Sequence, residues 1–142
     1  MKILLDLNVL LDLFLKRPLW VHDAAAIWAA HQAGRITAGI ASFSLPILYY
    51  IIRRSVDRAM ALDAVRDCRN GIAVWAVDAG TIALALHQTG PDFEDNLQLA
   101  CAIEAKVDAI ITRDPAGFVG SPIPILSPAD LVARLQPAPP GP

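Results

Sequence analysis

Two acidic residues near opposite ends of the sequence each follow a short apolar run. Asp6 follows residues 3–5, and Asp114 comes two residues after the run that ends at Thr112. In parallel α/β sheets the carboxyl ends of the strands share one edge, and ligands gather there. Carboxylates on that edge are suitable ligands for Mg²⁺, which takes one or two of them together with water and substrate phosphate. We therefore predict a metal site shared between distant parts of the chain, with Asn8 beside it.

A third group of acids, Asp92, Glu94 and Asp95, lies just ahead of an apolar segment with helical spacing. Acids are common at helix N-termini because they cap free N–H groups and suit the helix dipole, which explains Asp92 and Glu94. Asp95 differs, because helical spacing puts it on the same side as Leu99 and Ala102, the face expected to pack inward. A buried carboxylate needs a compensating partner, and a metal ion would be one.

Other polar residues have structural interpretations. Asp12 is expected on the exposed side of a helical turn, and Asp78 is expected to be the N-cap of an alanine-rich helix. Thr112 could orient a carboxylate or a water, although a threonine also suits a strand without any such role. An acid that ends a strand is, taken singly, more often a turn cap than a ligand. The metal-site prediction therefore depends on Asp6 and Asp114 sharing one edge.

The elements that must position these residues alternate between strands and helices. The expected strands cover residues 3–6, 36–41, 72–77 and 109–112, with a fifth at 123–126. The expected helices cover residues 8–16, 22–33, 44–54, 56–69, 78–88, 94–106 and 128–135. Strands separated by helices need crossover connections, which predicts an α/β fold with a parallel sheet of four or five strands and helices on both faces. We expect a single domain, residues 1–136, followed by a proline-rich tail, residues 137–142.

Composition limits the functional classes. The 142 residues suffice for one domain with a substantial core, and their net charge of -2 argues against a broadly basic nucleic-acid binder. The hydrophobic content of 55% is high, which favours an apolar partner surface in addition to the core. Cys68 and Cys101 are expected to be buried, reduced thiols, although a disulfide stays open. No signal peptide is expected because Asp6 and Asp12 interrupt the first apolar run, and no run approaches the ~18 residues of a membrane span. A cytoplasmic location is the default expectation.

Four segments together resemble the PIN domain. They run in order over almost the whole chain and comprise residues 5–12 (LDLNVLLD), 44–54 (SLPILYYIIRR), 92–95 (DFED) and 111–114 (ITRD). Small bacterial and archaeal proteins of this family are mostly VapC-type toxins, which are Mg²⁺-dependent ribonucleases neutralised by a cognate antitoxin. The resemblance implies a parallel sheet between helices, an RNA substrate, an antitoxin partner and a homodimer. It implies Mg²⁺ as the cofactor, with Mn²⁺ as a substitute.

The resemblance assigns roles residue by residue. The implied catalytic and metal-binding residues are the acids Asp6, Asp95 and Asp114. The resemblance also covers Asn8 as a supporting polar residue. Thr112 and Asp92 are expected to support the acids because of their positions in the sequence, and Arg113, beside Asp114, is the basic residue expected to meet RNA phosphate. Lys16, Arg17, Arg53 and Arg54 are weaker candidates for the same contact, because each is equally well explained as a solvated surface charge.

One expected ligand is missing. Family members usually place Glu or Asp in the helix just ahead of the tyrosine pair, where this chain has Ile47. Two hypotheses therefore stay open: a nuclease with a reduced acidic site, and a PIN-fold binding module that has lost catalysis and contacts RNA or protein. A phosphatase of the haloacid dehalogenase type is disfavoured, since that class needs an acid where this chain has Asn8.

Overall fold

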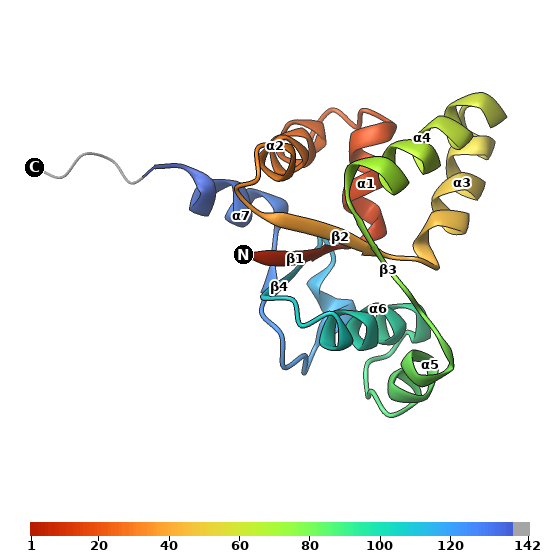
Figure 1. The fold of residues 1–142 in the computed structure, drawn as a ribbon, viewed down its shortest axis with the longest axis vertical. Coiled ribbons are helices and arrows are strands. Elements are labelled where there is room, and N and C mark those ends of the chain that lie inside the picture. Colours follow the sequence, from red (N-terminus) through yellow and green to blue (C-terminus); the bar gives the residue numbers. More distant parts are fainter. Residues whose placement is uncertain (138–142) are drawn as a thin grey trace, which may run out of the picture.

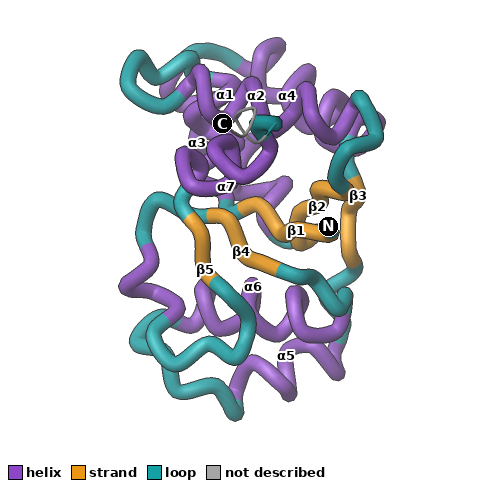
Figure 2. The backbone as a smooth tube through the Cα atoms, turned by 90° about the vertical axis from the view of Figure 1, so that its left-hand side faces the viewer, coloured by secondary structure: helices purple, strands orange, loops and turns teal. Residues whose placement is uncertain are grey.

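A five-stranded parallel sheet lies between two layers of helices in the computed structural model, which describes residues 1–137 (Figure 1). The strands are β1 (Lys2–Leu5), β2 (Thr37–Ala41), β3 (Ala73–Trp75), β4 (Ala109–Ile111) and β5 (Ile125–Leu126). Their order in the sheet is β3-β2-β1-β4-β5, which Figure 2 shows from the side. Every ladder is parallel. The predicted α/β fold and fifth strand are therefore confirmed. Of the predicted tail, residues 138–142 lie outside the described residues.

Helices connect all the strands. They are α1 (Leu7–Phe14), α2 (Val21–Gln32), α3 (Ser44–Ser55), α4 (Arg58–Gly71), α5 (Ala79–Leu86), α6 (Phe93–Glu104), the 3₁₀ helix η1 (Pro115–Phe118) and α7 (Pro128–Leu135). Figure 1 shows α1 to α4 on one side of the sheet and α5 with α6 on the other. Asp78 caps α5 by accepting the Thr81 N–H at 3.0 Å, as predicted.

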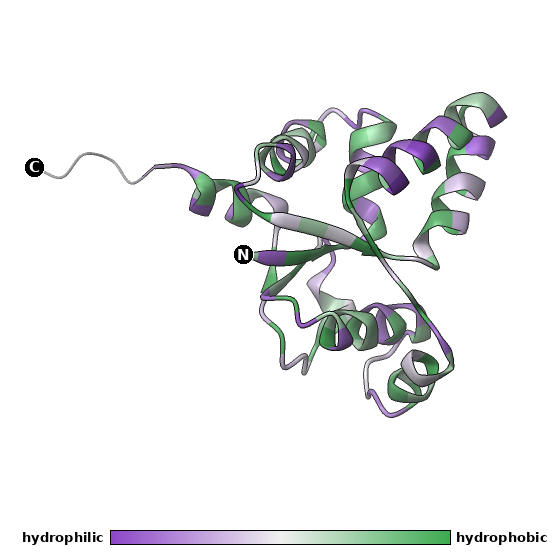
Figure 3. Ribbon diagram, viewed as in Figure 1, coloured by the Kyte–Doolittle hydropathy of each residue, from purple (hydrophilic) through white to green (hydrophobic). Residues whose placement is uncertain are grey.

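Both faces of the sheet are buried because successive strand residues point to opposite sides. Ile3 and Leu5 of β1 belong to the core that contains α1 to α4, whereas Leu4 between them packs in a second core with Leu99 and Ala102 of α6. Figure 3 shows the corresponding pattern, with hydrophobic residues where helices meet the sheet and hydrophilic residues along α4. The two cores fix the positions of α1 and α6 relative to the ends of the strands.

The register of β1 against β4 joins the two ends of the chain. Leu5 pairs with Ile111, and the Asp6 N–H donates to the Ile111 carbonyl at 2.9 Å. This hydrogen bond continues the ladder by one residue beyond β1. Asp6 and Thr112 consequently follow neighbouring strands at the same edge of the sheet.

Two smaller expectations can be compared with the structure. Cys68 and Cys101 are free and buried, and burial raises the pKa of the Cys68 thiol to about 12 and that of Cys101 to about 11. Both thiols are thereby kept protonated and unreactive at neutral pH.

None of the helices in residues 1–137 has the length and apolar character that a membrane span requires.

Candidate functional site

The Thr112 hydroxyl joins the N-terminal and C-terminal motifs. It donates to Asp6 Oδ2 at 2.6 Å and accepts the Asp114 N–H at 2.9 Å. Asn8 Nδ2 donates to Asp6 Oδ2 at 3.0 Å and to Thr112 Oγ1 at 3.2 Å, and Asn8 Oδ1 accepts the Arg113 N–H at 3.4 Å. A hydroxyl offers one donor and two acceptor positions, so that of Thr112 is fully used. The structure thus brings Asp6 and Asp114 to one edge, with Asn8 and Thr112 between them.

The Asp6 carboxylate is buried and already oriented. Asp6 is 7% exposed and occupies the N-cap position of α1, but its side chain does not accept a hydrogen bond from the helix backbone. Its oxygens instead accept hydrogen bonds from the side chains of Asn8, Thr112 and Gln98. Gln98 Nε2, from α6, donates to Asp6 Oδ1 at 3.0 Å. A carboxylate has about four lone-pair positions, and three of them are occupied. The remaining position, on Oδ1, is the one that can face a cation.

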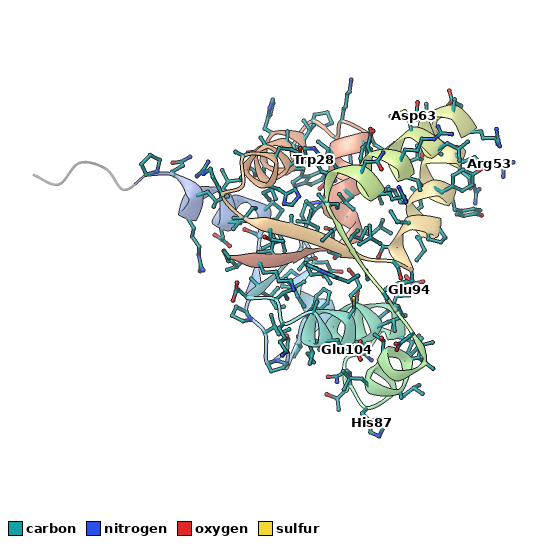
Figure 4. All side chains as sticks on the ribbon, in the orientation of Figure 1. Trp28, Arg53, Asp63, His87, Glu94 and Glu104 are labelled. Atoms are coloured by element: carbon teal, nitrogen blue, oxygen red, sulfur yellow. The ribbon has the colours of Figure 1, made fainter. Side chains whose placement is uncertain are left out.

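Asp95 lies among other carboxylates in the first turn of α6. Its N–H donates to the N-cap carboxylate of Asp92 at 3.1 Å. Burial raises the pKa of Asp95 to about 6, and the negative charges of Asp6, Asp92, Asp114 and Glu94 contribute to the same shift. Figure 4 places Glu94 at the N-terminal end of α6. We call Asp6, Asp95 and Asp114 the acidic cluster.

The raised pKa of Asp95 predicts a specific pH dependence in the metal-free protein. The folded state holds the Asp95 proton more tightly than the unfolded state, whose carboxyl has the ordinary value of 3.8. Asp95 therefore favours folding at low pH, and this contribution is lost as pH rises towards about 6. We expect the unfolding free energy of wild type to fall relative to that of Asp95→Asn as the pH rises from 4 to about 7. Chemical denaturation in EDTA measures it, and a difference that is constant with pH would contradict the shift.

Gly117 leaves room for the Asp95 carboxylate. It is buried in η1, and a Cβ atom placed on it would overlap Asp95 Oδ2. Only a residue without a side chain lets the strand-end turn after Asp114 approach α6 so closely. This contact fixes the position of Asp95 relative to the turn.

Replacing Gly117 with alanine is therefore expected to displace the Asp95 carboxylate and weaken Mn²⁺ binding by about 10-fold or more, the range found when support of a metal ligand is lost. Calorimetric titration with Mn²⁺ measures the effect. Ala116→Ser, at the exposed neighbouring position, is the matched control. Equal affinities in the two variants would show that the close contact is irrelevant to the cluster.

Asp12 corrects one prediction. It is fully buried, so its expected place on the exposed side of a helical turn is wrong. Arg113 Nε and Nη2 donate to its two carboxylate oxygens at 2.6 and 3.0 Å, and Arg17 Nη1 donates at 3.2 Å. The Arg113 guanidinium also stacks on the Trp20 ring, 3.9 Å from its centre. Asp12 is thus the counter-ion that ties Arg113, and with it the turn before Asp114, to α1.

The remaining candidates differ in their distance from the site. Ile47 is half-buried in the first turn of α3, a helix without any Asp or Glu. Arg53 lies on α3 at the outer side of the molecule (Figure 4). Asp114 is exposed at the start of η1, and Asp92 serves as a helix cap. Gln98 was missed by the sequence analysis, although it lies three residues after Asp95 on the same helical face.

The acidic cluster fits a hydrated cation better than a closed metal cage. Within residues 1–137, no three Asp, Glu, His or Cys side chains are grouped closely enough to form a ready-made site. The donors at this edge are nevertheless hard carboxylate oxygens, and burial together with the neighbouring negative charges raises the pKa of Asp95. Mg²⁺ commonly binds through one or two carboxylates and keeps several waters. The residues present match that mode of binding.

Comparison with known proteins gives a family and a fold. A family model described as PIN domain matches residues 2–116. No curated protein sequence matches the chain significantly.

Solved structures share its architecture at low sequence identity. DNA-bound VapBC from Salmonella typhimurium aligns with a TM-score of 0.70 and 17% identity, covering 90% of this chain and 98% of the other. VapBC2 from Rickettsia felis, bound to a promoter DNA fragment, gives 0.69 and 16%, covering 89% and 98%. VapC20 from Mycobacterium tuberculosis, a toxin that cleaves the sarcin-ricin loop, gives 0.63 and 16%, covering 76% and 86%. At these identities the likeness establishes a common fold.

Proposed function

This chain belongs to the PIN domain family, and from that membership we propose that it is a metal-dependent endoribonuclease of the VapC toxin type. The observation that carries the proposal is the link through Thr112, which joins Asp6 to the Asp114 backbone at the carboxyl edge of the sheet, with Asp95 packed against the following turn at Gly117. Mg²⁺ is the proposed cofactor, and Mn²⁺ would substitute for it. RNA phosphodiester bonds are the proposed substrate, as in the toxin whose fold it shares.

The proposed roles follow from the contacts at the site. A bound cation would lower the pKa of a coordinated water and neutralise charge on the scissile phosphate. Asp6, Asp95 and Asp114 would hold it, with Asp6 oriented by Thr112 and the other hydrogen-bond donors described above. Asp114 is exposed, so it is the cluster member most accessible to RNA.

Arg113 is proposed to contribute positive charge near the RNA phosphate. Its side chain is 24% exposed, but Nε and Nη2 are engaged by Asp12. Its position next to Asp114 supports an electrostatic contribution more than a bidentate phosphate clamp, which would need the same nitrogens. We therefore assign its strongest effect to holding the turn.

A second candidate function is a binding module without catalysis, and Ile47 is the observation that favours it. At the position where family members usually have Glu or Asp, the side chain of Ile47 offers no oxygen to a metal ion. The burial and orientation of Asp6 favour the enzyme instead, because a protein without a cation has little reason to bury an oriented carboxylate.

Mg²⁺ and Mn²⁺ titrations with a structured RNA decide between the two. Wild-type cleavage that disappears in EDTA and in Asp95→Asn supports the nuclease. Absence of wild-type cleavage, with cleavage gained in Ile47→Glu, identifies the impaired module. If neither wild type nor Ile47→Glu binds Mn²⁺ and neither cleaves RNA, the nuclease proposal is overturned.

Partners are proposed on the same basis. The related folds occur in toxin–antitoxin complexes, one of them from Klebsiella pneumoniae, and we propose a cognate antitoxin and a cytoplasmic location here. A homodimer is also proposed, supported by an apolar groove of about 330 Å³ on α3 and α4, lined by Leu45, Pro46, Tyr49, Leu62 and Val65. Light scattering that gives the mass of a single chain at micromolar concentration would contradict the homodimer.

A further inference from the structure

Only one of the two polar atoms in the buried side chain of Gln98 has a hydrogen-bond partner among residues 1–137. The side chain is 5% exposed, and Nε2 donates to Asp6 Oδ1 at 3.0 Å. Oε1 is also buried, yet it finds no hydrogen-bond partner within residues 1–137. Buried polar atoms are almost always paired, so an unpaired carbonyl oxygen indicates a donor that the protein chain does not itself supply.

The position of Gln98 indicates where that donor belongs. Oε1 and Nε2 are atoms of one amide group, so Oε1 lies close to the Asp6 carboxylate to which Nε2 is bonded. Asp95 lies three residues earlier on α6, on the same helical face. The unpaired oxygen is therefore near two members of the acidic cluster.

Asn96 is the other buried side chain with an unpaired oxygen among residues 1–137, and it differs from Gln98 in the partner of its amide nitrogen. Its Oδ1 is likewise buried without a partner in the described residues, but its Nδ2 donates to the Gly90 carbonyl at 3.1 Å, in the loop before α6. Asn96 therefore secures a loop, whereas Gln98 contacts a carboxylate of the cluster.

We propose that Gln98 is a positioning residue of the metal site: Nε2 orients Asp6, and Oε1 accepts a hydrogen bond from a hydration water of the divalent cation. This inference rests on the proposed function, because it requires a hydrated cation at the acidic cluster. An amide serves both purposes, since it supplies one donor and one acceptor without adding charge. A glutamate at this position would place a further acceptor against Asp6.

The test is calorimetric Mn²⁺ titration of the full chain, with unfolding in EDTA measured in parallel. In Gln98→Met, a variant of similar length that removes both polar atoms, Mn²⁺ affinity should fall by about 10- to 100-fold. The unfolding midpoint in EDTA should change little, because the substitution also removes an unpaired buried oxygen. Gln88→Met is the matched control: Gln88 is half-buried, and its Nε2 donates to the Leu84 carbonyl at 3.3 Å, on α5 and the turn after it.

The other outcomes separate this inference from the proposed function. If wild type binds Mn²⁺ and Gln98→Met binds it equally well, Gln98 has no part in the site and only this inference fails. A loss of stability in EDTA with unchanged affinity of the folded variant also overturns it, because that result describes a purely structural amide. If wild type neither binds Mn²⁺ nor cleaves RNA, the proposed function fails and the inference fails with it. Should Gln98→Met not fold, Gln98→Asn, which keeps the amide but withdraws it by one methylene, is judged by the same criterion.

Discussion

Replacing Asp6 with asparagine is expected to reduce metal-dependent RNA cleavage by at least about 100-fold, while the protein stays folded. Loss of a group that only orients a metal ligand costs 10- to 100-fold, and loss of the ligand itself should reach at least the upper end of that range. Asparagine has the shape of aspartate, but its Nδ2 must face one of the donors that now bond to the carboxylate, Asn8, Thr112 or Gln98. Removing the Asp6 charge should also lower the pKa of Asp95 from about 6 towards its ordinary value.

Single-turnover cleavage of a structured RNA measures the first effect, and NMR titration of the Asp95 carboxyl measures the second. Asp63→Asn is the matched control, since Asp63 is exposed on α4, in the helical layer opposite α6 (Figure 4). Cleavage that persists in Asp6→Asn at the wild-type rate would show that a contaminating nuclease, and not the acidic cluster, is responsible.

Replacing Arg113 with methionine is expected to lower the free energy of unfolding by about 3 kcal/mol, the lower end of the effect of breaking a buried ion pair. Asp12 would remain fully buried, with Arg17 as its one remaining cation among the described residues. The stacking contact with Trp20 would also be lost. Urea denaturation at constant pH measures the change.

Two comparisons sharpen this prediction. Arg66→Met removes an exposed pair with Asp63 and should cost less than about 1 kcal/mol. The double variant Asp12→Leu/Arg113→Met should recover much of the lost stability, because it removes both charges together. A single Arg113→Met variant that loses no more stability than Arg66→Met would show that the buried pair contributes little.

The positions of the strands and the parallel direction of the sheet could be predicted because several local sequence signals agree. Short apolar runs separated by helical segments predict crossover connections and parallel pairing. Parallel pairing places the acids that follow β1 and β4 at the same edge of the sheet. That β1 and β4 are neighbours, which places Asp6 beside Thr112, was a condition of the predicted metal site, and only the folded sheet shows it.

Asp12 could not be placed by the same reasoning, because its partner is distant in sequence. A charged residue is usually exposed, but Val9, Leu10 and Leu11 around it are all buried, so α1 has little polar face for Asp12. The counter-ion is Arg113, 101 residues further along the chain. Only the folded contacts identify that pair.

Gln98 was within reach of the argument that identified Asp95. Both are polar residues on one side of α6, where Gln98 is buried and Asp95 is half-buried, and both require partners there. The amide of Gln98 was not predicted as part of the site, because an uncharged residue carries no metal-ligand signature by itself.

The most direct test of the central claim, that side chains from both ends of the chain hold one divalent cation, is a crystal structure of the wild-type protein with Mn²⁺, read from its anomalous scattering. We predict one peak at bonding distance, roughly 2.1 Å, from carboxylate oxygens of Asp6 and of Asp114 or Asp95, with waters completing the coordination. A peak bound elsewhere, or none at the acidic cluster at millimolar Mn²⁺, would contradict it.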